Sequence, residues 1–185
     1  MPRLFAGIEL PEMAKAQLSM LRGGLHGAKW VEPANYHITL RFAGDVTNEQ
    51  AGDFADALAD IEAGAFDVEI NGLGSFGGDK PRSVWAAMTP CEALLRLQKL
   101  TERAARTAGL PPETQNYTPH ITLARLNHAL ASEVAHYLQT AGARLRFTFP
   151  VKRFALFSAR AHQGGGPYVV EETYSLYGAE GDEEE

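Results

Sequence analysis

Two short segments of the chain pair a histidine with a threonine two positions later. His37 and Thr39 stand in His-Ile-Thr-Leu, and the same four residues recur with His120 and Thr122. On a strand, residues two apart point to the same face, so each histidine projects together with its threonine. An unperturbed imidazole has a pKa of about 6.5, so one ring can be neutral and the other protonated near pH 7. Such a pair can take a proton from water and give one to a leaving oxygen.

Phosphate is the group that this set of side chains fits best. The hydroxyls of Thr39 and Thr122 can donate hydrogen bonds to non-bridging phosphate oxygens. The chain has no Gly-x-Ser-x-Gly segment for a nucleophilic hydrolase. Two histidines without nearby acidic or cysteine partners fall short of a usual zinc set, so we expect no metal and no cofactor. A single His-Ile-Thr-Leu strand is more often structural, but its repetition at matched positions favours a functional role.

The repeated motif belongs to a longer internal repeat. Residues 5–12 resemble residues 85–92, and residues 73–76 resemble residues 156–158, in the same order as the two motifs. A period this long indicates duplicated lobes rather than a solenoid. We therefore expect one domain over residues 1–177, built from two intertwined halves at about 1–80 and 81–177.

The elements that must position the motifs follow from periodicity and capping signals. Alternating or apolar runs predict strands at 4–10, 37–42, 66–70, 83–88, 120–123, 145–149, 153–157 and 168–177. Helical spacing predicts helices at 11–21, 47–61, 94–109 and 132–139, and Thr47 with Gln50 forms a capping box. The predicted fold class is α+β, with two pseudo-symmetric lobes whose antiparallel sheets flank a central cleft and whose helices lie outside. No glycine-rich loop follows a strand in the form that a Rossmann or P-loop site needs.

Composition excludes several classes of protein. The 185 residues are 45% apolar and 22% charged, and Cys91 is the one cysteine, which fits a reducing cytoplasm. No run reaches the roughly 20 apolar residues of a membrane helix, so we expect a cytoplasmic monomer without a membrane partner. The net charge is −6, and much of it lies in residues 178–185, which predict a disordered acidic tail. The remaining body is nearly neutral, which argues against coating long nucleic acid but not against acting on an RNA end.

The two motifs resemble those of a known superfamily. The chain resembles the 2H phosphoesterase superfamily and, within it, is similar to the RNA 2',3'-cyclic phosphodiesterases, also called the 2'-5' RNA ligase family. The resemblance runs along nearly the whole chain, through both His-Ile-Thr-Leu motifs and the arginine after the second. It implies a bilobed fold and metal-independent hydrolysis of an RNA 2',3'-cyclic phosphate to a 2'-phosphate, with weak, reversible 2'-5' joining as a side activity.

The resemblance also implies roles for individual residues. It puts His37 and His120 in catalysis, Thr39 and Thr122 on the phosphate, and makes Arg125 the phosphate-contacting arginine. We expect His37 to protonate the departing ribose oxygen and His120 to activate water, with the reverse order nearly as well supported. Simple alternation does not place Arg125 on the His120 face, so a bulge or a strand end must turn it inward.

Three further residues are candidates for binding substrate. Arg41 shares the His37 face by parity, and a surface role fits it as well as a binding role. Phe42 could stack on a base, but the same parity directs it into the core. Tyr168 follows a glycine-rich stretch and is a candidate to line the cleft.

Several functions remain open on the sequence alone. RNA ends or small nucleotide cyclic phosphates are the expected partners, and 2'-5'-linked oligonucleotides would use the same site. A binding module that grips phosphate ends without turnover is a further alternative. The intact histidine and threonine in both motifs weigh against it.

Overall fold

The computed structural model describes residues 2–159 and 167–178, which form an α+β fold with two antiparallel sheets. The first sheet has the strand order β3-β1-β8-β9, and the second has the order β2-β6-β5-β4-β7. The strands of the first sheet are β1 (Arg3–Glu9), β3 (His37–Asp45), β8 (Arg153–Ala159) and β9 (Tyr168–Ser175). Those of the second are β2 (Ala28–Trp30), β4 (Phe66–Phe76), β5 (Ser83–Met88), β6 (Ile121–Leu126) and β7 (Arg146–Val151).

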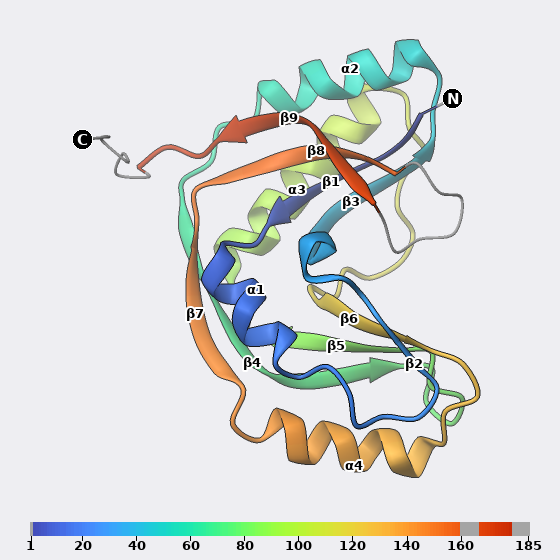
Figure 1. The fold of residues 1–185 in the computed structure, drawn as a ribbon. Coiled ribbons are helices and arrows are strands. Elements are labelled where there is room, and N and C mark those ends of the chain that lie inside the picture. Colours follow the sequence, from blue (N-terminus) through green and yellow to red (C-terminus); the bar gives the residue numbers. More distant parts are fainter. Residues whose placement is uncertain (1, 160–166, 179–185) are drawn as a thin grey trace.

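The two sheets repeat one plan with exchanged strands. The order β3-β1-β8-β9 corresponds to β6-β5-β4-β7, so β3 and β6, which carry the two motifs, take matching places. Each sheet contains strands from both halves of the sequence, because β4 joins the second sheet and β8 and β9 join the first. In Figure 1 the sheets lie one above the other, with the long strands β4 and β7 running up one side.

Helices cover the outer faces of the sheets. Helices α2 (Asn48–Ala59) and α3 (Glu92–Thr107) pack against each other and against the first sheet, while α4 (Ala131–Gly142) packs on β4 of the second (Figure 1). Helix α1 (Glu12–Ser19) contacts the short 3₁₀ helix η1 (Pro33–Asn35). The capping box that begins α2 is present: Gln50 N–H donates to Thr47 Oγ1, and Thr47 N–H donates to the Gln50 side chain. No helix in the described ranges is long and apolar enough to cross a membrane.

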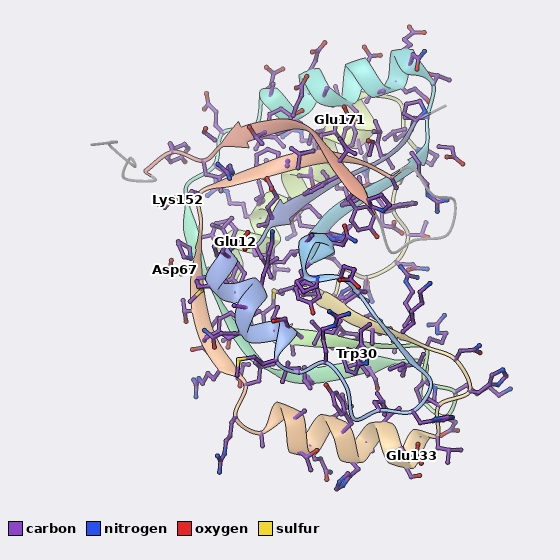
Figure 2. All side chains as sticks on the ribbon, in the orientation of Figure 1. Glu12, Trp30, Asp67, Glu133, Lys152 and Glu171 are labelled. Atoms are coloured by element: carbon purple, nitrogen blue, oxygen red, sulfur yellow. The ribbon has the colours of Figure 1, made fainter. Side chains whose placement is uncertain are left out.

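Most predicted elements are present, with shifted bounds. The helix predicted at 11–21 is shorter at both ends, and the strand predicted at 66–70 continues to Phe76. Strand β2 was not predicted, because three residues between a glycine-rich turn and Pro33 carry no periodicity. It pairs with β6 and carries Trp30, which is labelled in Figure 2. The Trp30 ring packs against Tyr137 of α4, with 5.8 Å between the ring centroids. Residues 179–185 of the predicted acidic tail lie outside the described residues.

One large apolar core joins the two sheets. The alternate residues of the motifs, Ile38 and Leu40 on β3 and Ile121 and Leu123 on β6, are at most 2% exposed and belong to this core. Burial of these four side chains fixes the opposite face of each strand toward the space between the lobes. Strands β3 and β6 also approach each other, so the two motifs come together.

Candidate active site

A bulge follows the motif in each of the two strands. On β3, Thr39 pairs with Gly7 and Arg41 pairs with Ala6, so Leu40 has no partner of its own in the ladder. On β6, Thr122 pairs with Trp85 and Ala124 with Val84, so Leu123 is the extra residue. A bulge shifts the alternation of side chains by one position. Each strand therefore buries two successive residues and presents the next one on the face of its histidine.

Because of the bulge, two side-chain directions predicted from simple alternation along β3 are wrong. Arg41 does not share the face of His37; its side chain is buried at 7% exposure and lies against α3. Phe42 does not point into the core; it is 45% exposed and lines the cleft together with His37 and Thr39. Simple alternation failed here because Leu40 and Arg41 are both buried in succession.

The second bulge turns Arg125 toward the cleft. Leu123 and Ala124 are both fully buried, and the next residue, Arg125, is exposed. Arg125 lines one cavity of about 270 Å³ together with His37, Thr39 and Thr122. The bulge that the sequence analysis required to turn Arg125 inward is therefore present.

His37 lies among aromatic rings and has both ring nitrogens engaged. Its ring centroid is 4.8 Å from Phe5 of β1, 5.9 Å from Phe157 of β8 and 5.0 Å from Tyr168 of β9. Nδ1 lies 2.8 Å from the Asn35 carbonyl oxygen, and Nε2 lies 3.0 Å from Thr39 Oγ1. A carbonyl can only accept, so Nδ1 carries the proton and Nε2 of the neutral ring accepts from the threonine hydroxyl.

His120 repeats this arrangement in the second lobe. Its Nδ1 lies 2.6 Å from the Thr118 carbonyl oxygen, so Nδ1 donates here as well. Phe76 of β4 meets the ring edge-on at 5.0 Å, and Trp85 of β5 lies at 5.8 Å. The indole can lie flat across the sheet because its partner is a glycine: a Cβ on Gly74 would stand 2.4 Å from it. Both imidazoles are therefore oriented by a backbone carbonyl two residues earlier and supported by aromatic rings, three at His37 and two at His120.

Burial sets the charge of His37. Burial, together with the smaller effect of the positive charges of His120 and Arg125, lowers the pKa of His37 from 6.5 to about 4. The hydrogen bond to the Asn35 carbonyl opposes this shift. His37 is accordingly neutral at pH 7, and its Nε2 lone pair accepts the hydrogen bond from the Thr39 hydroxyl.

The cations at the site are divided between two environments. Arg3 and Arg125 line the same cavity as the two threonines, and Arg3 also lies 5.2 Å over the ring of Phe42. Arg41 instead binds protein groups with all of its donor nitrogens: it pairs with Glu102 of α3 and donates to the carbonyls of Phe42 and Pro111. Tyr168 lines the cavity of about 270 Å³ together with His37.

Sequence reasoning missed the residues that orient the histidines. Asn35 and Thr118 act through backbone carbonyls, which any residue type supplies, so no side-chain pattern marks them. Tyr117 was also missed, although its hydroxyl donates to the Thr39 carbonyl at 2.7 Å and joins the segment before His120 to β3. The supporting rings Phe5 and Trp85 did have a signal, since they hold matching places in the internal repeat.

No ligand set for a metal is present among the described residues: they contain no cluster of three or more histidine, cysteine, aspartate or glutamate side chains. The arrangement has another capacity. His37, Thr39, Thr122 and Arg125 line one cavity, and His120 lines a neighbouring cavity that shares Thr39 and Phe42 with the first. These side chains offer imidazoles for proton transfer and hydrogen-bond donors for an anion.

Known proteins resemble this chain along most of its length. A family model described as "LigT like Phosphoesterase" matches residues 8–85 and 88–168. A protein of Thermus thermophilus named RNA 2',3'-cyclic phosphodiesterase is 32% identical over 98% of this chain and 94% of its own. One of Aeropyrum pernix with the same name is 41% identical over 55% of this chain and 58% of its own.

A solved structure shares the fold. Escherichia coli LigT in complex with 3'-AMP superimposes with a TM-score of 0.75, covering 96% of this chain and 99% of that one at 21% identity. Fold and site together define a phosphoesterase with a duplicated histidine–threonine motif. The chain belongs to the LigT-like phosphoesterase family of the 2H superfamily.

Proposed function

We propose that the protein hydrolyses the 2',3'-cyclic phosphate at the end of an RNA to a 2'-phosphate, without a metal ion. The observation that carries this proposal is the pair of imidazoles, each with Nδ1 tied to a backbone carbonyl and therefore with Nε2 as its reactive atom. Two such groups supply both proton transfers of a hydrolysis, so the chemistry needs no metal-bound water. The relatives named RNA 2',3'-cyclic phosphodiesterase support the choice of substrate.

The reaction assigns one task to each imidazole. One Nε2 takes a proton from water while the water oxygen forms a bond to phosphorus. The bond from phosphorus to the 3'-oxygen breaks, and the other imidazole gives its proton to that oxygen. Thr39, Thr122 and Arg125 hold the non-bridging oxygens, whose negative charge grows in the transition state.

The two histidines are proposed to act in the order opposite to the one that the sequence favoured. His37 is held neutral by burial, so in the free protein it can accept a proton at Nε2 but has none to give there. His37 is then the base that activates water, and His120 is the acid that protonates the 3'-oxygen.

Small nucleotide 2',3'-cyclic phosphates are a second candidate substrate class. The E. coli structure named above is a complex with a mononucleotide, 3'-AMP, and other structures of that protein hold ATP and NADP+. Cleavage of 2'-5'-linked oligonucleotides and weak, reversible 2'-5' joining would use the same groups.

The proposal is tested with an oligoribonucleotide that carries a labelled 2',3'-cyclic phosphate. After hydrolysis, a phosphatase specific for 3'-phosphates should leave the label in place, because the 3'-oxygen is the one that departs. Removal of the label would show that the ring opens in the other direction. No conversion of the oligonucleotide or of a mononucleotide cyclic phosphate would overturn the function itself.

A further inference from the structure

We infer that Lys29 extends the phosphate site of Arg125 by one subsite, which binds the internucleotide phosphodiester that precedes the cyclic phosphate of an RNA end. This inference rests on the proposed function and deepens it, because it makes an oligonucleotide, rather than a mononucleotide, the preferred substrate. Lys29 is the middle residue of β2, the edge strand of the second sheet, and Arg125 lies on the neighbouring strand β6 (Figure 1).

The register of the second sheet places Lys29 directly beside Arg125. The two residues are Cα partners in the antiparallel pair of β2 and β6, and Arg125 is also the partner of Ser83 on β5. Side chains that are directly opposite in such a pair point to the same face, with Cβ atoms about 4.5–5.5 Å apart. Two positive side chains and a hydroxyl therefore form a row across three strands.

Packing on the other face of the sheet shows that this row faces the cleft. The residues that follow its three members, Trp30, Leu126 and Val84, pack in one apolar cluster with Tyr137 of α4. Successive residues of a strand point to opposite faces, so the row lies on the side away from α4. Arg125 agrees with this direction, because it lines the cavity that contains the motif threonines.

The two positive charges of the row have no compensating partner within the described part of the chain. Both side chains are exposed, and neither forms an ion pair with another described residue. Like charges directly opposite each other destabilise a sheet. A bound anion offsets this repulsion, so Lys29 and Arg125 are suited to binding phosphate groups of a substrate.

The position of Lys29 fits the phosphate next to the terminal one. Lys29 does not line the cavity in which the cyclic phosphate is proposed to bind, and its strand lies one step farther out than that of Arg125. Neighbouring strands are about 4.8 Å apart, and the four-carbon stem of a lysine adds reach. The ammonium can therefore meet the phosphodiester one ribose away from the phosphate on Arg125. Because β2 is the outermost strand of the described sheet, an RNA strand can leave the site over it.

The chemistry of a lysine side chain indicates how the subsite acts. An ammonium is a compact charge with rotatable donors, so it contacts a phosphodiester without the fixed geometry that a guanidinium imposes. Contacts to backbone phosphate position a nucleic acid but carry no sequence information. We therefore expect the subsite to favour an RNA end over a mononucleotide whatever its bases are.

The test compares three substrates that end in the same uridine 2',3'-cyclic phosphate. The first is this mononucleotide, the second is the dinucleotide UpU with the same end, and the third is that dinucleotide with a neutral methylphosphonate in place of its phosphodiester. For the wild type we expect KM to be about fivefold lower for the charged dinucleotide than for the neutral one, the scale of an exposed ion pair. Lys29→Ala should remove this difference and make the salt slope of binding for the charged dinucleotide shallower by about 0.7.

Two further variants and the two other substrates serve as controls. Lys29→Ala should change KM for the mononucleotide and for the neutral dinucleotide by less than about twofold, because neither carries an internucleotide charge. Lys29→Arg keeps the charge and should retain most of the difference between the dinucleotides. Lys99→Ala, which removes an exposed charge from α3, is the matched control and should behave as the wild type on all three substrates.

The outcomes separate the subsite from the proposed function. Equal KM for the two dinucleotides in the wild type, or a KM for the charged dinucleotide that Lys29→Ala leaves unchanged, would overturn the subsite, although hydrolysis of these substrates would uphold the proposed function. Equal rises on all three substrates would also overturn the subsite, because Lys29 would then act on the cyclic phosphate or on the fold. A wild type that hydrolyses none of the three would overturn the proposed function itself.

Discussion

Phe42 and Arg125 occupy equivalent positions in the two lobes. Each is the fifth residue after a cleft histidine, and each is turned into the cleft by the bulge that follows its motif. The residues just before them, Arg41 and Ala124, are both buried. The two bulges thus present an aromatic ring from the first lobe and a guanidinium from the second. The duplicated site is therefore symmetric in its histidines and threonines and asymmetric at this position.

Arg125 is predicted to contribute most of the charge that holds the phosphate. Replacing it by alanine should raise KM for an oligoribonucleotide cyclic phosphate about 10- to 100-fold, the scale of a charge-assisted hydrogen bond. Because few phosphates are neutralised, we expect a shallow slope of log K against log salt, about −1 to −2, which the variant reduces by about 0.7. Titration of binding at several salt concentrations measures both quantities.

Arg125→Lys is the matched control, since it keeps the charge but loses the planar pair of donors. It should keep the salt slope while recovering only part of the affinity. A wild-type slope several times steeper would reveal an extended contact with RNA that this site does not contain.

We predict that a substrate with a better leaving group will show which histidine is the acid and which is the base. In a 2',3'-cyclic phosphate with sulfur in place of the 3'-oxygen, the departing thiolate needs no proton. His120→Ala should then hydrolyse this substrate at nearly the wild-type rate, while losing about 10²–10⁴-fold on the oxygen substrate. His37→Ala should lose that factor on both substrates, because water still needs a base. Rescue of His37→Ala instead would reverse the assignment.

The pH dependence of kcat/KM gives an independent measure of the same order. The proposed mechanism requires His37 without its second proton and His120 with it, so the profile should be bell-shaped. Since burial lowers the pKa of His37 to about 4, the rising limb should lie near pH 4. A rising limb near pH 6.5 would show that His37 is not the base in the free protein.

The sequence predicted the site residues better than it predicted their directions. Periodicity was sufficient to predict that the histidine and threonine of each motif share one face, because these residues lie on regular strand before the bulge. Beyond Leu40 the side chains no longer alternate between the two faces of the strand. Arg41 is therefore buried and Phe42 lies on the cleft face, the reverse of what alternation predicts. A bulge depends on the register with a neighbouring strand, which residue types along one strand do not encode. Asn35 and Thr118 could not be predicted for a similar reason, because they act through backbone carbonyls, which every residue type has.

The buried pair of Arg41 and Glu102 is predicted to hold the segment before His120 in place. Arg41→Met removes the charge and leaves the carbonyls of Phe42 and Pro111 without their donor. Breaking a buried pair by removing one partner costs about 3–5 kcal/mol of unfolding free energy, measured by urea titration. Glu102→Gln keeps acceptor groups for the Glu113 N–H and should cost less. If Arg41→Met is no less stable than a surface substitution such as Arg96→Met, the pair has no such role.

Chelation is predicted to leave the activity unchanged. In the proposed mechanism the two imidazoles perform both proton transfers, so hydrolysis should proceed at the same rate after exhaustive treatment with a chelator. Metal analysis of the purified protein should find no stoichiometric ion. Full loss of turnover on chelation, with recovery on adding one divalent ion, would contradict the two-histidine mechanism.

Holding His37 neutral is predicted to make the fold sensitive to acid. Its pKa is about 4 in the folded protein and about 6.5 when unfolded, so between these values the unfolded chain binds more protons. Unfolding free energy should therefore fall as the pH drops from about 6.5 toward 4, by up to about 3 kcal/mol from this residue. His37→Gln removes this component, and urea titrations at pH 7 and pH 4.5 measure the difference for variant and wild type. Carboxylates titrate in both proteins and cancel in the comparison, whereas equal losses in the two would mean that the imidazole is not held neutral by the fold.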